Sequence, residues 1–329
     1  MTTRILICDD SSFARKQMAR ALPADWAVDI TFAANGEEGL AAVRSGKGEI
    51  LFLDLNMPVL DGYQVLRRLA SQDLQTKVIV VSGDMQPEAH KRVMALGALA
   101  FMQKPIDPAA LAGVLDRHGL RGTGTAAEHA FDVQVDARDC YQEIANVAMG
   151  RAADLLARLL DAFVIMPIPV VNMLEPTELH MALDHVDGRQ AAVGVCQGFI
   201  GSGIAGEALL ILNEASLPDI ADLMRFKGEL NDGAQVELLM DIASTLIGAC
   251  LKGVADQLDI KFSQGHPQVL GRHIKMGELV RRNAARWRKT LAIEMACEIR
   301  DRNVNCSLLL LFTEDSIAPL NELVSYLND

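Results

Sequence analysis

Short, almost continuously apolar runs alternate with amphipathic segments over the first 120 residues, and this alternation limits the fold more than any other feature. The apolar runs lie at 5–8, 50–55, 77–83 and 98–104. Segments with helical spacing lie between them, at 13–22, 36–45 and 63–72. Strands that are apolar throughout are buried on both faces of a sheet. The pattern therefore predicts an α/β domain with a doubly wound, five-stranded parallel sheet.

The rest of the chain repeats itself at an offset of 100 residues, since Leu209, Glu214 and Ser216 correspond to Leu309, Glu314 and Ser316. Long helices are expected at 139–163 and 233–257, one for each copy, with apolar strands after each. We therefore expect a pseudo-twofold α/β domain in which two long helices pack on a sheet. Small, flexible residues around Gly122 predict a first domain at 1–120, a linker at 121–130 and a second domain at 131–329.

The distribution of charge excludes one class of partner. Of the net charge of −12, the first 120 residues carry −1 and the remainder −11. Binding to nucleic acid needs Lys and Arg to replace counterions, so a nucleic-acid partner is not expected. We find no apolar run near the ~20 residues of a membrane-spanning helix and no signal-peptide core, which predicts a cytoplasmic chain without a membrane partner. The six cysteines have no metal-ligand spacing and are expected to be buried thiols.

Polar residues follow the predicted parallel strands at the points where each strand ends. Asp9 and Asp10 follow the first, Asp54 the third, Ser82 the fourth and Lys104 the fifth. These ends converge on one crevice. Three carboxylates there suit Mg²⁺, and Asp54 can attack a phosphoryl group whose oxygens Lys104 and Ser82 then bind.

This stretch resembles the response-regulator receiver family, which has a flavodoxin-like fold. The matching motifs are the Asp9-Asp10 pair, Asp54 in D-x-N-M-P, Asp61-Gly62, Ser82-Gly83 and Lys104-Pro105. The resemblance implies that Asp54 accepts a phosphoryl group from a CheA-like sensor histidine kinase. It implies that Asp9, Asp10, Asp54 and the backbone carbonyl of Asn56 hold Mg²⁺, and that Ser82 and Lys104 sense the phosphate. Phe101 stands where the family often has Tyr, and we expect it to report the change by its packing.

The first long helix carries Asp139, Glu143 and Asn146 at helical spacing, which places them on one polar stripe. An ordinary solvated face explains such a stripe when one helix is considered alone. The repeat changes this interpretation, because the second helix carries Asp241 and Ser244 at the same spacing, and 22 residues separate both Asn146 and Ser244 from a following proline.

The spacing resembles the signature of the CheC/CheX/FliY phosphatase family, here Asp139-x₃-Glu143-x₂-Asn146-x₂₂-Pro169. The resemblance implies that Asn146 orients a water and that Glu143 binds a lysine of the receiver whose aspartyl phosphate is hydrolysed. We expect both side chains on an exposed helical face. In the second copy Asp241 and Ser244 replace Glu and Asn, so we expect that site to be weak or inactive.

These features predict a two-component response regulator whose CheC-like domain dephosphorylates CheY-like receivers under the control of Asp54. Two alternatives stay open: a non-enzymatic adaptor that only docks a partner, and hydrolysis in cis of the phosphate on its own receiver. The family resemblance also suggests a CheD-like partner and a homodimer.

Overall fold

The computed structural model describes residues 2–121, 135–174, 192–272 and 290–328. They form two compact units, Met1–Glu143 and Ile144–Asp329. The boundary falls inside one helix, α6 (Ala137–Leu160), so the first turns of α6 belong to the first unit. Residues 122–130 of the predicted linker lie outside the described residues, and the predicted domain limits stay predictions.

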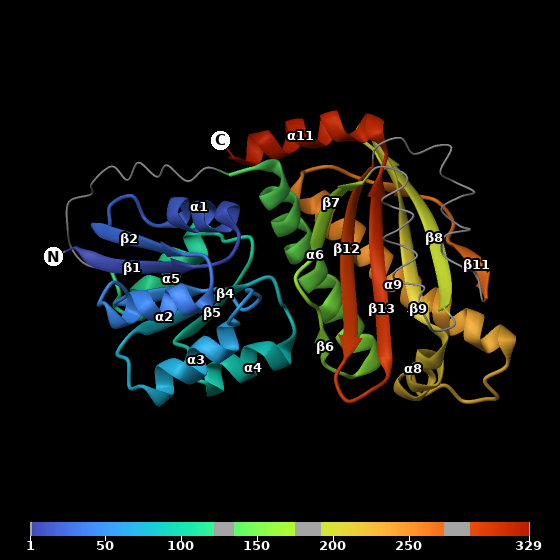
Figure 1. Ribbon diagram of the computed structural model, residues 1–329, viewed down its shortest axis with the longest axis horizontal. Helices are drawn as coiled ribbons and strands as arrows, with labels where there is room; N and C mark the ends of the chain where they lie inside the picture. The colour runs from blue at the N-terminus through green and yellow to red at the C-terminus, as the bar shows by residue number, and fades with distance from the viewer. Residues whose placement is uncertain (1, 122–134, 175–191, 273–289, 329) are drawn as a thin grey trace. The chain divides into compact units, whose positions relative to one another are not determined.

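The first unit contains a five-stranded parallel sheet in the order β2-β1-β3-β4-β5 (Figure 1). The strands are β1 (Thr3–Cys8), β2 (Val28–Ala33), β3 (Ile50–Leu53), β4 (Lys77–Ser82) and β5 (Ala100–Gln103). The helices are α1 (Ser12–Ala21), α2 (Gly36–Arg44), α3 (Gly62–Ser71), α4 (Pro87–Ala95) and α5 (Pro108–Arg117).

Both faces of this sheet are buried, as the apolar strands predict. In β1, Ile5 and Ile7 pack in the core that α1 and α5 cover, whereas Leu6 and Cys8 pack in the core that α2, α3 and α4 cover. Alternate side chains of a strand point to opposite faces, so a continuous apolar run fills two cores at once. The predicted doubly wound sheet is confirmed.

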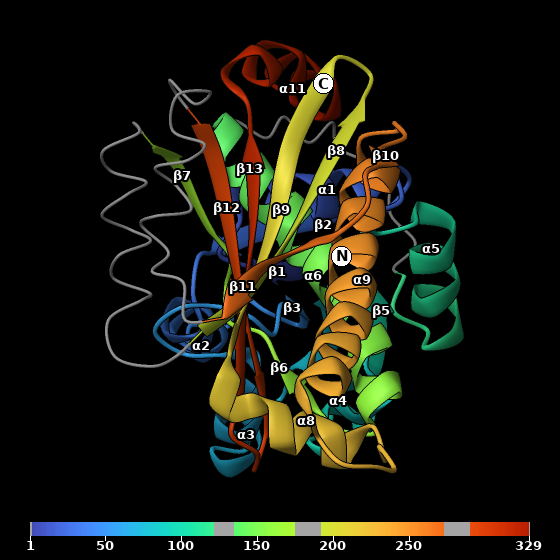
Figure 2. The same cartoon turned by 90° about the vertical axis from the view of Figure 1, so that its right-hand side faces the viewer.

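The second unit is built on an eight-stranded antiparallel sheet with the main order β10-β8-β9-β13-β12-β6 (Figure 2). β11 pairs with β8, and β7 pairs with β12. The strands are β6 (Val164–Ile165), β7 (Val170–Leu174), β8 (Ala192–Gly201), β9 (Ile204–Asn213), β10 (Ser263–Gln264), β11 (Gln268–Arg272), β12 (Thr290–Ile299) and β13 (Val304–Phe312). The sequence pattern missed β6, β7, β10 and β11, because segments of two to five residues give too few positions for a period to be recognised.

The internal repeat is visible in the register of the central pair. β9 and β13 run antiparallel. Leu209 lies opposite Leu309, so one pair of residues 100 positions apart faces each other across the two strands. The serines that follow these two strands make equivalent hydrogen bonds. Asn305 donates its backbone N–H to Ser216 Oγ at 3.3 Å, and Ala205, 100 residues earlier, donates to Ser316 Oγ at 2.8 Å. The repeat is therefore a structural pseudo-twofold, as predicted.

In the part of the second unit that the structure describes, four helical elements accompany the end of α6: η1 (Glu214–Ser216), α8 (Leu217–Leu223), α9 (Asp232–Gln257) and α11 (Glu314–Asn328). α9 contacts β8 and β9, and it lies close against α6. A Cβ at Gly253 of α9 would come within 2.7 Å of Ala148 Cα in α6. Gln257 Nε2 also donates to the carbonyl oxygen of Ile144 at 2.9 Å. The two predicted long helices thus pack on each other, and α9 also packs on the sheet.

Helix α9 bears on the expectation that no segment of the chain spans a membrane. Among the described helices it is long and apolar enough to cross a membrane by length and composition alone. However, 61% of its most apolar stretch is buried, and this is the pattern of a core helix. α9 has apolar side chains around most of its circumference, which raises its hydropathy without a continuous apolar run.

Candidate functional site

Backbone pairing brings the polar strand ends of the first unit together. Asp9 and Asp54 follow β1 and β3, and the Asp54 N–H donates to the Cys8 carbonyl at 2.9 Å. Lys104 follows β5, and its N–H donates to the Ser82 carbonyl at 3.0 Å. The four predicted residues therefore lie at one edge of the sheet, as expected for the carboxyl ends of parallel strands.

The loop after β1 is held by its own sequence. The Ser11 side chain accepts the N–H of Ala14 and caps α1, while the Ser11 N–H donates to Asp9 Oδ1 at 3.0 Å. Arg15, one turn into α1, donates to the backbone carbonyls of Asp9 and Asp10 at 2.6 and 3.1 Å. These contacts fix the Asp9 and Asp10 backbone at the mouth of the site.

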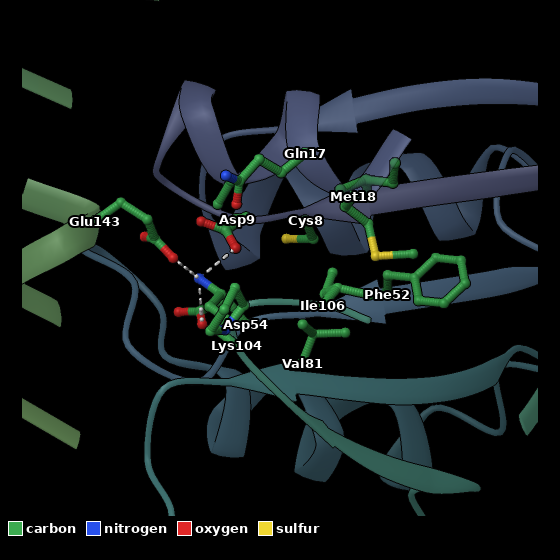
Figure 3. A pocket seen from close by; sticks show the side chains of 13 residues that line it. Cys8, Asp9, Gln17, Met18, Phe52, Asp54, Val81, Lys104, Ile106 and Glu143 are labelled. Carbon is green, nitrogen blue, oxygen red and sulfur yellow. Dashed lines mark ion pairs between the residues drawn. The ribbon is translucent and has the colours of Figure 1, made fainter. Parts of the chain in front are cut away.

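Lys104 lies at the centre of the site, within ion-pair distance of three carboxylates (Figure 3). Its Nζ is 2.7 Å from Asp9 Oδ2, 3.1 Å from Asp54 Oδ1 and 3.0 Å from Glu143 Oε1. All four side chains are at most 8% exposed. One cation therefore neutralises a cluster with an excess of negative charge.

The excess charge is visible in the acid–base properties of the site. Burial, reinforced by Asp9 and Asp54, raises the pKa of Asp10 to about 8. Burial also raises the pKa of Asp54 to about 6 and that of Glu143 to about 7, although Lys104 opposes both shifts. Burial alone would lower the pKa of Lys104, but the three carboxylates hold it well above its ordinary value. The excess negative charge of the cluster favours the binding of a further cation.

The donor set fits Mg²⁺. One carboxylate oxygen from each of Asp9, Asp10 and Asp54 lies within 4.8 Å of the others, and hard oxygen ligands are those that Mg²⁺ prefers. The backbone N–H of Asn56 donates to Asp54 Oδ2 at 2.7 Å, which orients that carboxylate. The predicted ligand role of the Asn56 carbonyl stays a prediction.

Of the other phosphate-sensing candidates, Ser82 ends β4 at this end of the sheet, whereas Phe101 is the second residue of β5. Ser82 is buried, and its hydroxyl accepts the N–H of Asp84 at 3.1 Å. Phe101 lies on β5 and packs edge-to-face on His90 of α4, with ring centroids 5.4 Å apart. Neither contact tests the predicted roles.

The first motif corrects the expectation of an exposed helical face. Glu143 is 5% exposed and Asn146 is 7% exposed. The Glu143 carboxylate is buried against Lys104, and with Asp9, Asp54 and Lys104 it lines a cavity of about 20 Å³. Such a volume holds roughly one water. The second motif differs, because Asp241 and Ser244 are exposed.

Two contacts were missing from the expectations based on sequence. The Ser12 hydroxyl donates to Asp139 Oδ2, and Glu143 pairs with Lys104 of the same chain. Asp139 and Glu143 are one helical turn apart on α6, so both contacts come from one side of the helix. No sequence signal indicated them, because these pairs are 127 and 39 residues apart.

Comparisons with known proteins find relatives of the first unit. Residues 5–116 match the family model of the response regulator receiver domain. A protein-glutamate methylesterase/protein-glutamine glutaminase of Geobacter sulfurreducens is 31% identical over 149 residues, which are 45% of this chain and 40% of that protein. This chain therefore spans less than half of that relative.

Two solved structures are similar to parts of the chain. FliY of Thermotoga maritima is 18% identical, with 60% of this chain and 99% of that chain covered and a TM-score of 0.46. A chain of the CheX-CheY-BeF3-Mg+2 complex from Borrelia burgdorferi is 27% identical, with 36% and 90% covered and a TM-score of 0.33.

The fold, the acidic site and the family match together define residues 5–116 as a receiver domain. A receiver domain indicates a two-component response regulator.

Proposed function

We propose that this response regulator hydrolyses the aspartyl phosphate of a receiver, with Glu143 and Asn146 of α6 as the residues that act on it. The observation that carries the proposal is the 3.0 Å pair between Glu143 Oε1 and Lys104 Nζ, the same ammonium group that lies 3.1 Å from Asp54. An acid of the first motif thus binds the lysine of a phosphorylation site. This is the contact that the CheC-like resemblance implies for hydrolysis.

The chemistry requires positioning and no covalent intermediate on α6. An aspartyl phosphate is an activated ester, and Lys104 can neutralise charge on its oxygens. Mg²⁺ bound by Asp9, Asp10 and Asp54 would supply further neutralisation of the phosphoryl oxygens. Asn146 lies three residues after Glu143, on the same side of the helix, and its amide can both donate to and accept from a water. Orienting this water towards phosphorus is the rate-increasing step that we assign to Asn146.

Phosphate release tests the role of Asn146. The chain is phosphorylated with acetyl phosphate, the donor is removed, and inorganic phosphate is followed over time. Asn146→Ala should release phosphate about two orders of magnitude more slowly than the wild type, because the water loses its orienting group. Ser244→Ala, at the equivalent position of the second motif, should leave the rate unchanged, since Ser244 cannot supply the amide geometry.

Equal rates for Asn146→Ala and the wild type, both folded by circular dichroism, would remove Asn146 from the reaction. That result would favour the adaptor, in which the second unit only docks a partner. A CheA-like kinase as phosphodonor, a CheD-like partner, a homodimer and a cytoplasmic location belong to the same proposal and await direct measurement.

A further inference from the structure

The phosphorylation site of the first unit is closed in this structure. The side chain of Asp54 is fully buried, and that of Lys104 is 4% exposed. The cavity that both residues line, together with Glu143, has a volume of about 20 Å³ and holds roughly one water. A phosphoryl group adds a phosphorus atom and its oxygens, so it does not fit on Asp54 while the cavity keeps this shape.

Glu143 is the residue that has to move (Figure 3). The Lys104 ammonium group has three N–H donors, and three carboxylate oxygens lie within 3.1 Å of its nitrogen. Two of them belong to Asp9 and Asp54, which follow the strands of the sheet, and the third belongs to Glu143 of α6. A phosphoryl group carries about two negative charges, so it repels the Glu143 carboxylate and competes with it for the same ammonium group.

The beginning of α6 is held at a second point. Ser12, the first residue of α1, donates its hydroxyl to Asp139. Asp139 and Glu143 are one helical turn apart, so the two contacts hold the same side of the helix. Both contacts lie within the compact unit Met1–Glu143, and the first turns of α6 therefore belong to the unit whose phosphorylation site they close.

We propose that residues 137–143, the first turns of α6, form an autoinhibitory cap in which Glu143 occupies the place on Lys104 that a phosphoryl oxygen takes. Asp54 is then phosphorylated only when the cap opens, and its phosphoryl group keeps the cap open. The inference goes beyond the proposed function and needs no hydrolysis by α6. Because two anions compete for one ammonium group, each weakens the binding of the other by the same factor.

The cap also gives the control by Asp54 a direction. While Glu143 lies on Lys104 of its own chain, it is not available to the lysine of another receiver. Phosphorylation of Asp54 displaces Glu143 and frees it for such a contact. This consequence rests on the proposed function, whereas the block on phosphorylation does not.

Binding of fluoroberyllate to the full-length chain tests the competition without any turnover. This ion takes the place of a phosphoryl group on an aspartate and is not hydrolysed, and ¹⁹F NMR follows its binding in the presence of Mg²⁺. Glu143→Gln should bind it about tenfold more tightly than the wild type, because a neutral amide competes less well for the ammonium group. The control Glu88→Gln removes one charge from an exposed residue of α4 and should leave the Kd unchanged.

Asp139→Ala separates a cap from a local effect of charge. This variant keeps the Glu143 carboxylate but loses the contact with Ser12, so the cap should open more often. Fluoroberyllate should therefore bind more tightly to Asp139→Ala than to the wild type. The initial rate of phosphorylation by acetyl phosphate should also be higher in Asp139→Ala and in Glu143→Gln than in the wild type.

The remaining outcomes decide between the two proposals. Equal affinities of the wild type and Glu143→Gln would overturn the cap, whatever the rate of hydrolysis. An Asp139→Ala variant that binds like the wild type would reduce the effect of Glu143 to local charge and would overturn the cap as well. If both affinities rise but Asn146→Ala releases phosphate as fast as the wild type, the cap stands and the proposed function falls.

Discussion

At the scale of single residues, the site is a cluster of carboxylates that share one lysine. Asp9, Asp54 and Glu143 all contact Lys104, and burial opposes the ionised form of each acid whose pKa is raised. The loop after β1 nevertheless holds Asp9 and Asp10 in place through Arg15. This geometry is maintained at an electrostatic cost, which a divalent cation bound to the three aspartates would reduce.

Because of this electrostatic cost, the free energy of unfolding should depend on pH and on Mg²⁺. Burial raises the pKa of Asp10 to about 8 and that of Asp54 to about 6, so the metal-free fold binds protons that the unfolded chain has lost. Stability should therefore fall as pH rises from 6 to 8 in EDTA. Mg²⁺ needs the ionised carboxylates, so it should raise the Tm more at pH 8 than at pH 6.

Thermal denaturation with and without Mg²⁺ measures both effects. Asp10→Asn should flatten the pH dependence in EDTA and reduce the increase in Tm caused by Mg²⁺. If Mg²⁺ raises the Tm of the wild type equally at pH 6 and pH 8, these carboxylates are not the Mg²⁺ ligands.

At the scale of elements, the packing of α6 on α9 positions the first motif. The two helices approach closely because α9 has a glycine where α6 has Ala148: a Cβ at Gly253 would lie 2.7 Å from Ala148 Cα. The contact lies two residues beyond Asn146 on α6. Any displacement of α6 at this point moves the motif with it.

A pair of glycines in α9 tests this packing. Gly253→Ala should destabilise the protein by roughly 1–3 kcal/mol, because the added methyl overpacks the interface. Gly248→Ala has nothing within 4 Å of the new Cβ and should stabilise it by up to about 1 kcal/mol through helix propensity. Urea denaturation of both variants measures whether each substitution lowers or raises the free energy of unfolding. A stabilised Gly253→Ala variant would show that the helices can separate at little cost.

At the scale of the whole molecule, two compact units share helix α6, since the boundary at Glu143 falls within it. Glu143 belongs to the first unit and Asn146 to the second, so the two residues of the first motif lie on either side of the boundary.

The burial of α9 also leads to an expectation about membranes at this scale. α9 has the length and composition of a spanning helix, yet its apolar side chains are core residues such as Leu238, Ile242 and Leu246. We expect the purified protein to stay in the dense fraction when vesicles are floated on a density gradient, because insertion would expose the rest of that core. Flotation with the vesicles would contradict this expectation.

The sequence by itself determined the receiver fold, the convergence of Asp9, Asp54, Ser82 and Lys104, and the internal repeat. These follow from periodicity and from the rule that parallel strands end at one edge, which are local or topological properties. The register of Leu209 opposite Leu309 then agrees with the offset read from the residues.

Only the tertiary structure decided where Glu143 and Asn146 lie. Helical spacing places them on one side of α6 but carries no information about what covers that side, so an exposed face was predicted and a buried one is found. The pair between Glu143 and Lys104 joins residues on different elements. Its position depends on how the chain folds back on itself, and no periodic pattern encodes such a long-range contact.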